Sequence, residues 1–187
     1  MNSLLILLLA PGAAAVPPPV EQTSAQSGAP VYAPDHLVCG DPELLALDAR
    51  LASVLASAPP AVADGWVEGH AEWFRRRSRC AFLEAHRQCL SEAYTDRLEL
   101  LGYLVPPKTA GSPASCRGAD YTGTLQISGD ATAGRRVLVD PRTGGVVAVA
   151  AARNRFGAWT PSLAFESGGA ETVFTRHDGT SFRCRAV

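Results

Sequence analysis

The spacing of apolar residues changes abruptly at "VPPKTAGSPAS", residues 105–115, and divides the chain into two unlike parts. Before this segment apolar residues recur every three or four positions, as on one face of a helix. After it they alternate with polar residues, as on a strand. The prolines and glycines of the segment itself interrupt regular structure. The sequence therefore predicts an α+β chain of two small domains, with a helical part at 39–105, a linker at 106–113 and a β part at 114–187.

The helical part predicts three helices in an antiparallel bundle, because the connections between them are short. Asp41 can cap the first helix, Pro42 suits its first position, and Pro59 and Pro60 stop it. The other two helices are expected at about 61–79 and 84–104. The faces expected to be buried carry Trp66, His70, Trp73, Arg77 and Cys80 in the second helix, and Leu90, Tyr94, Arg97, Leu101 and Leu104 in the third.

The arginines of "WFRRRSR" fall into two groups on the second predicted helix. Arg77 shares the apolar face, so we expect it to pack on an aromatic ring and to pair with an acid such as Asp48 or Glu92. Trp73, Arg77, Tyr94 and Arg97 are therefore expected to be structural. The remaining arginines point away from that face and should be solvated, or form a patch for an anionic glycan or phosphate; they are Arg75, Arg76 and Arg79.

The β part predicts a small antiparallel barrel or sandwich. The run "DYTGTLQIS" alternates apolar with polar residues, and further short runs follow it, separated by glycine-rich turns such as "PRTGG" and Asp178-Gly179. The runs are "DYTGTLQIS", "RRVLVD", "GVVAVAAA", "SLAFES", "ETVFTRHDG" and "TSFRCRAV".

The first residues predict a secretory signal peptide. The apolar run at 4–10 is too short to span a bilayer, and an A-x-A arrangement at Ala13 and Ala15 favours cleavage near Ala15. The alternative is an apolar tail that is not cleaved. Residues 16–38 are rich in Pro, Ser, Ala and Gly, which predicts a disordered linker. The expected location is the periplasm or the cell exterior.

Secretion makes the five cysteines candidates for disulfides. Cys80 and Cys89 lie on either side of one helix connection, and a bond between Cys116 and Cys184 would tie the two ends of the β part. Cys39 is then left over. It can compete as a partner of Cys80 or Cys89, or join two copies of the chain in a dimer.

No motif of an enzyme is present: the chain lacks G-x-S-x-G, H-E-x-x-H and a phosphate-binding glycine loop. The net charge of −1 gives no basic excess for nucleic acid. Three alternatives stay open, namely a nucleophilic Cys39 near His36, a glycosidase-like carboxylate pair of Glu166 and Glu171, and a zinc site. The zinc ligands would come from Cys39, His70, Cys80, His86 and Cys89. We expect a binding protein that uses no cofactor or metal.

The helical part carries a recognisable constellation. Cys39 precedes "DPELLALDARL", W-x-x-x-R-x-x-C follows at 73–80, and C-L-x-x-x-Y-x-x-R-x-x-x-L follows at 89–101. This pattern resembles the N-terminal domain of the LprI-type lysozyme inhibitors, which are small secreted or lipid-anchored bacterial modules.

The β part is similar to the C-type lysozyme inhibitor domain of the MliC kind, through "LAFESGGAETVFTRHDGTSFRC" and the placement of Cys116 and Cys184. That resemblance implies a small β-barrel closed by a disulfide, which inhibits by inserting loop side chains into the lysozyme cleft. Gly157 and Trp159 would correspond to the glycine and tyrosine of the family's S-G-x-x-Y motif. Ser167 and Gly168 would correspond to the lysine and glycine of its T-K-G motif, so the family's lysine is absent, and its serine has no clear counterpart.

The resemblances imply that the chain binds and occludes a C-type lysozyme or related cell-wall glycosidase. In that case Trp159 should protrude as an aromatic anchor, and Glu166 should face the arginine-rich surface of a lysozyme. The alternative is an envelope module that does not inhibit and that binds peptidoglycan or another envelope protein. The residues expected to make the contact are Gly157, Trp159, Glu166, Ser167, Gly168 and Gly169.

Overall fold

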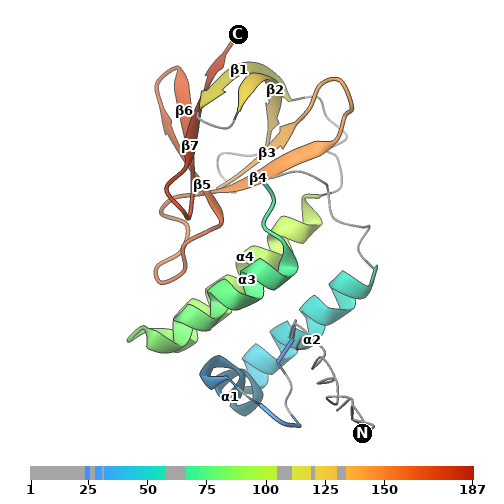
Figure 1. Cartoon of the computed structure of the whole chain (residues 1–187), viewed down its shortest axis with the longest axis vertical. Helices are drawn as coiled ribbons and strands as arrows, with labels where there is room; N and C mark the ends of the chain where they lie inside the picture. Colours follow the sequence, from blue (N-terminus) through green and yellow to red (C-terminus); the bar gives the residue numbers. More distant parts are fainter. Residues whose placement is uncertain are drawn as a thin grey trace, which may run out of the picture.

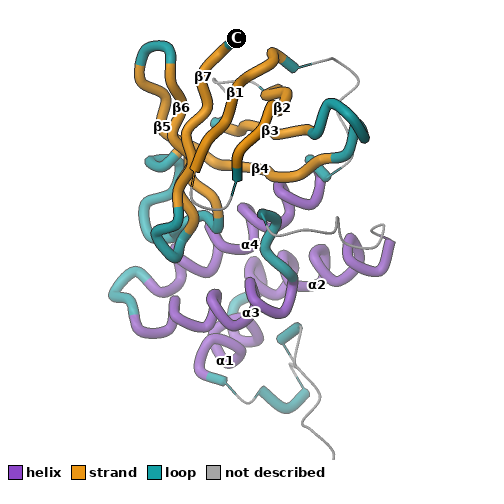
Figure 2. The backbone as a smooth tube through the Cα atoms, turned by 45° about the horizontal axis from the view of Figure 1, so that its top comes forward, coloured by secondary structure: helices purple, strands orange, loops and turns teal. Residues whose placement is uncertain are grey.

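The chain consists of a closed β-barrel stacked on a layer of helices (Figure 1). The computed structural model describes residues 24–25, 28–30, 32–57, 66–104, 111–118, 121–129 and 134–187. Figures 1 and 2 show α3 and α4 next to the barrel, with α1 and α2 on the far side of them. The helices are α1 (Ala33–Gly40), α2 (Pro42–Ser57), α3 (His70–Arg77) and α4 (His86–Gly102), with a 3-10 turn, η1 (Ser78–Phe82), between α3 and α4.

The predicted three-helix bundle is not confirmed, because the described residues include a further helix, α1. This helix lies where a disordered linker was predicted, so that prediction is wrong for residues 33–38. Pro34 occupies its first turn, where a missing N–H costs no hydrogen bond. Asp35 and Val38 are fully buried against the other helices. A helix as short as α1 leaves little periodicity in the sequence, so the composition indicated a linker. Contacts with the other helices stabilise α1.

The second helix begins later than predicted, at His70. Residues 61–65 of the predicted helix lie outside the described part of the chain. Trp66 is not helical: its ring packs edge-on against Phe182 of the barrel, with 4.6 Å between the centroids. The Arg176 guanidinium lies 5.2 Å from the same ring. Trp66 thus belongs to the contact between barrel and helices.

The first predicted helix is confirmed as α2, and its cap is the predicted one. The Asp41 carboxylate accepts the backbone N–H groups of Glu43 at 2.9 Å and Leu44 at 3.2 Å. These bonds satisfy two donors that have no partner inside the helix. Leu44 and Leu51 then face the core. The predicted stop at Pro59 and Pro60 lies outside the described residues.

The helical core surrounds a fully buried arginine, Arg77. Its guanidinium donates to Asp35 at 2.6 Å and to the Tyr94 hydroxyl at 2.5 Å, and it lies 4.0 Å from the Phe74 ring. The Tyr94 hydroxyl in turn donates to Asp48 at 2.7 Å. The stacking on an aromatic ring is confirmed. The direct pairing with Asp48 or Glu92 is wrong, because Asp35 supplies the counter-charge.

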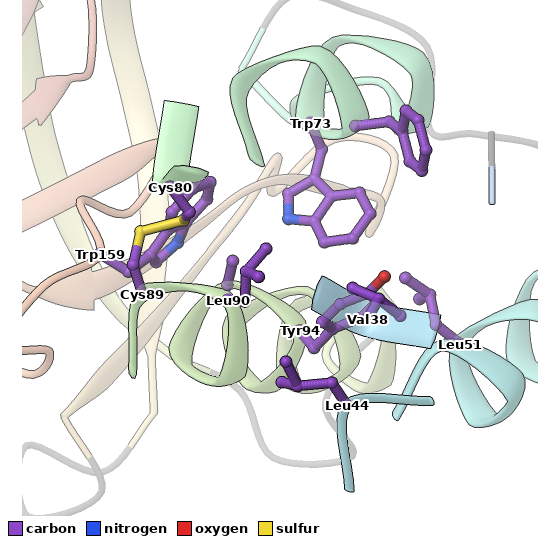
Figure 3. Packing of buried hydrophobic residues seen from close by; sticks show 11 residues of the cluster. Val38, Leu44, Leu51, Trp73, Cys80, Cys89, Leu90, Tyr94 and Trp159 are labelled. Atoms are coloured by element: carbon purple, nitrogen blue, oxygen red, sulfur yellow. A yellow bond between two sulfur atoms is a disulfide. The ribbon is translucent and has the colours of Figure 1, made fainter. Parts of the chain in front are cut away.

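Apolar side chains fill the space around this network (Figure 3). Burial raises the pKa of Tyr94 above its ordinary value, so its hydroxyl stays protonated and can donate. The buried apolar residues of this cluster include Val38, Leu44, Leu51, Trp73, Phe74, Leu90, Ala93 and Tyr94.

The barrel closes with seven strands in sequence order, because β1 pairs with β7. All neighbouring strands are antiparallel except β4 and β5, which are parallel over two residue pairs. The predicted antiparallel barrel is therefore confirmed apart from that pair. The strands are β1 (Ser112–Gly118), β2 (Thr122–Ser128), β3 (Arg135–Val139), β4 (Val146–Ala152), β5 (Leu163–Gly168), β6 (Glu171–Arg176) and β7 (Ser181–Ala186).

The first strand, β1, was not predicted, because its proline and serines give no alternation of apolar residues. Cys116 lies inside this strand and not before it. It faces Cys184 of β7 and is bonded to it. The other predicted disulfide, Cys80–Cys89, is also present, and Cys39 is a half-buried thiol outside both bonds.

The outer face of β3 and β4 packs on α4. Val137 and Val149 are buried outside the barrel with Leu100, while Leu138 and Ala148 fill its interior. Strands covered on both faces read as continuous apolar runs, as in "RRVLVD" and "GVVAVAAA". These two runs therefore mark the side of the barrel that the helices cover.

Replacing Asp35 by Ala is expected to lower the free energy of unfolding by about 3 kcal/mol, because the buried Arg77 loses its counter-charge. Urea denaturation followed by circular dichroism measures this. The matched control is Glu43→Ala, which removes an exposed partner of Arg87 and should cost less than about 1 kcal/mol. Equal losses for the two variants would contradict the structural role of Arg77.

Candidate functional site

The two loops predicted to contact a lysozyme lie in different environments. The loop that contains Gly157 and Trp159 connects β4 to β5 and packs against α4. The loop at 166–169 forms the hairpin between β5 and β6, which projects from the end of the barrel away from the helices (Figures 1 and 2). The structure therefore does not combine them into one contact surface.

The first loop is held by the carboxylate of Glu92 on α4. One oxygen accepts the N–H of Gly157 at 3.0 Å, and the other accepts those of Ala158 at 2.7 Å and Trp159 at 2.9 Å. The Gln88 side-chain amide also donates to this carboxylate, at 2.8 Å. Three consecutive backbone donors on one carboxylate fix the conformation of the loop and its position on α4.

Trp159 does not protrude, so the prediction of an exposed aromatic anchor at this position is wrong. Its side chain is 5% exposed and joins the helical core beside the Cys80–Cys89 disulfide (Figure 3). The indole N–H donates to Asp96 at 2.8 Å. A buried indole needs such an acceptor. Trp159 connects the barrel to the helices and is not available to a partner.

Arg76 covers one face of this indole. It was predicted to be solvated, and that prediction is wrong: its guanidinium lies 4.0 Å from the Trp159 ring and binds both carboxylate oxygens of Glu68, at 2.6 and 2.8 Å. It also donates to the Thr160 carbonyl at 2.5 Å. Arg76 lies off the helical face that packs on the other helices, but the barrel buries it from the opposite side. Arg75 and Arg79, the other two arginines that were predicted to be solvated, are both exposed.

A second ionic cluster joins β3 to α4. Arg135 is buried and donates to Asp96 at 2.7 Å and to Glu99 at 2.7 and 3.0 Å. Arg155 donates to both oxygens of Glu99, at 2.7 and 2.9 Å. Asp96 thus accepts from Arg135 through one oxygen and from the Trp159 indole through the other. The junction between barrel and helices therefore combines these ionic clusters with the apolar contact of Leu100 with Val137 and Val149.

Two of the acidic residues of this junction, Glu92 and Glu99, have pKa values below the ordinary range. Partial burial by itself would raise the pKa of Glu92, but the hydrogen bonds from Gln88 and from residues 157–159 lower it. For Glu99, burial opposes the shift in the same way, and the hydrogen bonds from Arg135 and Arg155 lower the pKa. Both carboxylates are therefore charged at neutral pH, and the junction depends on that charge.

The hairpin between β5 and β6 keeps its predicted candidates at the surface. Residues 166–170 are all exposed, and Gly169 has φ +59°, a left-handed conformation that favours glycine in the turn. The pairing of Ser167 with Thr172 and of Gly168 with Glu171 fixes the register up to the turn. Glu166 forms an ion pair with Arg153. This is a slender tip built from small residues.

The structure gives other partners to residues of the alternatives that the sequence left open. Glu166 pairs with Arg153 and Glu171 lies 3.9 Å from Arg185, so each of these two carboxylates has an arginine partner of its own. Cys80 and Cys89 are bonded to each other and cannot bind zinc as thiolates. Among described residues, the carboxylates of Glu68 and Glu72 lie near the ring nitrogens of His177, but Glu68 already binds Arg76 through both oxygens.

Two surface features were not predicted. The first is Phe82, which is 87% exposed, beside the exposed Leu83 in the loop closed by the Cys80–Cys89 disulfide. The second is a groove of about 380 Å³ on the outside of β1, β6 and β7. It is lined by Ser115, Arg117, Glu171, Arg183 and Arg185. The signal in the sequence was the pair of arginines on either side of Cys184, at outward-facing strand positions.

Comparison of the chain with protein-family models, with curated proteins and with solved structures found no match. The resemblances to lysozyme inhibitors thus remain predictions. The two intramolecular disulfides indicate an oxidising, extracytoplasmic location. Among the described helices none is long and apolar enough to cross a bilayer. The predicted signal peptide lies outside the described residues.

Replacing Glu92 by Gln is expected to speed amide hydrogen exchange at Gly157–Trp159 by about tenfold, because charged acceptors hold N–H donors more strongly than neutral ones. Exchange followed by mass spectrometry or NMR measures this. Glu84→Gln changes an exposed glutamate just before α4 and should leave these amides unaffected. Unchanged exchange in Glu92→Gln would contradict the anchoring role.

Stability is expected to fall as the pH is lowered below about 5. Glu92 and Glu99 have lower pKa values in the folded chain than in the unfolded chain, so unfolding takes up protons in acid. Their stabilising contribution is complete above the unfolded value of about 4.3 and is lost as the pH falls through the folded value. In thermal melts from pH 7 to pH 3, the double variant Glu92→Gln/Glu99→Gln should show a shallower decline. A decline as steep as that of the unmodified chain would exclude these carboxyls as its cause.

Proposed function

We propose that this chain is a secreted binding protein that occludes the cleft of a lysozyme-like glycosidase with the β5–β6 hairpin. The observation that carries the proposal is the hairpin itself, a narrow exposed tip on a closed and disulfide-bonded barrel. The resemblance to C-type lysozyme inhibitors, quoted above for "LAFESGGAETVFTRHDGTSFRC", supports the same contact.

The hairpin is suited to enter a cleft because it is both slender and fixed. Its tip carries only small side chains, those of Ser167, Gly168, Gly169 and Ala170. Below the tip, Phe165 packs near Phe174 inside the barrel, with 6.3 Å between the ring centroids. A loop that is already ordered loses little conformational entropy on binding, which favours affinity.

The charge near the tip also fits a glycosidase cleft. Such clefts carry two catalytic carboxyl groups, which repel a negative side chain. Here the negative charge of Glu166 is balanced by Arg153, which is about half exposed. The pair can therefore approach an acidic cleft without a net negative charge, and Arg153 offers a guanidinium to its carboxylates.

One observation favours the alternative, an envelope module that binds cell-wall glycan or another envelope protein without inhibition. Gly157 and Trp159, which the resemblance would place in the family's first inhibitory motif, are engaged in the junction with α4. An inhibitor that acts through the hairpin must therefore do so with one of the two expected loops.

Replacing Gly168 by Trp is expected to abolish inhibition of a C-type lysozyme, because a large side chain widens the tip. Its φ is not positive and a Cβ at this position meets no atom within 4 Å, so the fold should tolerate the change. Lysis of bacterial cells is followed by turbidity, with the oxidised protein added at near-stoichiometric amounts. The matched control is Gly40→Trp at the end of α1, another exposed glycine with open space, which should inhibit like the unmodified chain.

Complete lysis in the presence of a large excess of the unmodified protein would refute the proposal and favour the alternative. Inhibition that survives in Gly168→Trp would move the contact away from the hairpin. A thermal melting curve is measured for each protein used in the assay, so that loss of the fold is distinguished from loss of binding.

A further inference from the structure

The groove on β1, β6 and β7 gathers three arginines on one outer face of the barrel. Cys116 and Cys184 point into the barrel and are bonded, so their neighbours along each strand point outward. Arg117 of β1 and Arg183 of β7 are direct partners across the two strands. Arg185 follows two residues later on β7, opposite Ser115.

This arrangement is unfavourable in the absence of a ligand. Like charges directly opposite one another on antiparallel strands destabilise a sheet. Within the described part of the chain, no carboxylate lies within ion-pair distance of Arg117 or Arg183. Among the described residues, Glu171 is the single acid that lines the groove, and it lies 3.9 Å from Arg185. The described lining therefore carries an excess of two positive charges, although the whole chain has a net charge of −1.

We propose that this groove binds phosphate groups of an extended anionic chain. The two guanidinium groups and the Ser115 hydroxyl line the groove from neighbouring strands and do not lie in one plane. A tetrahedral phosphate offers oxygens in several directions, to Arg117, to Arg183 and to Ser115 together, whereas both oxygens of a carboxylate lie in one plane. The geometry thus favours phosphate over carboxylate.

Arg185 extends the site along the strand. Two residues of a β-strand span about 7 Å, so Arg185 offers a second cationic position next to the first. A ligand with charges repeated along its length would use both positions. Glu171 competes with that ligand for Arg185, because it is the partner of Arg185 across β6 and β7 and lies on the same face.

This inference goes beyond the proposed function and does not depend on it. The central pair, Arg117 and Arg183, lies away from the hairpin tip, and the assay contains no glycosidase. A chain that binds phosphate without inhibiting lysozyme, or the reverse, would separate the two proposals.

The experiment measures binding of inorganic polyphosphate to the oxidised full chain by calorimetry at low and at moderate salt. Arg183→Gln is expected to weaken binding by at least about tenfold, because the charge-assisted hydrogen bonds of the Arg183 guanidinium to phosphate are lost. The matched control is Arg50→Gln, an exposed arginine on α2 with the same change in net charge, which should alter affinity by less than twofold. Glu171→Gln should tighten binding, because it removes the competing carboxylate.

Arg183→Lys serves as a second variant that keeps the charge, and it is expected to bind more weakly than the unmodified chain, because it lacks the fork. Absence of binding by the unmodified chain would overturn the proposal, as would equal losses for Arg183→Gln and Arg50→Gln. Equally tight binding of polygalacturonate, a carboxylate polymer, would overturn the assignment to phosphate.

A second experiment compares vesicles of phosphatidylglycerol with vesicles of phosphatidylcholine. Binding to the phosphatidylglycerol vesicles that depends on Arg183 identifies a lipid headgroup as the source of the phosphate. Binding of polyphosphate alone identifies a soluble polymer.

Discussion

The carboxylate of Glu92 fixes the loop between β4 and β5 on α4, and the placement of the barrel on the helices depends on this contact. The same loop makes the crossover between β4 and β5, which are the parallel neighbours among the described strands. Their pairing extends over two residue pairs, Ala151 with Ala164 and Ala152 with Phe165. The shortest seam of the barrel therefore lies beside the loop that α4 holds, so closure of the barrel and docking on the helices support each other.

Buried arginines give the structure its specific geometry. Arg76, Arg77 and Arg135 each bind a carboxylate from another segment of the chain. Removing such a charge from water is costly unless its partner is placed well, so each pair excludes arrangements in which the partner is displaced. The planar guanidinium also stacks on an aromatic ring at Arg76 and Arg77, which uses its weakly hydrated faces. These contacts define where the segments meet more than they contribute net stability.

The junction also decides which surfaces a partner can reach. It encloses Trp159 and the loop around it, together with the outer face of β3 and β4. The end of the barrel away from the helices stays exposed and carries the hairpin at 166–169. The outer face of β1, β6 and β7 carries the arginine groove. Both proposals concern this open half of the barrel, whereas the helices act as the support that orients it.

Local signals in the sequence determined the elements. The cap at Asp41, the runs that form β2 to β7 and the two disulfide pairs were predicted from residues near one another in the chain or from the redox compartment, and they are confirmed. The predicted break at 105–115 lies partly outside the described residues, and its residues 112–115 belong to the unpredicted strand β1. The tertiary structure alone decided the helical state of α1, the burial of Arg76 and the inward position of Trp159. Asp35 stabilises α1 by meeting Arg77 from 42 positions away, and Arg76 and Trp159 are buried because the barrel docks on α3 and α4. Periodicity reports one buried face of an element, and it contains no information about a second face that a distant part of the chain covers.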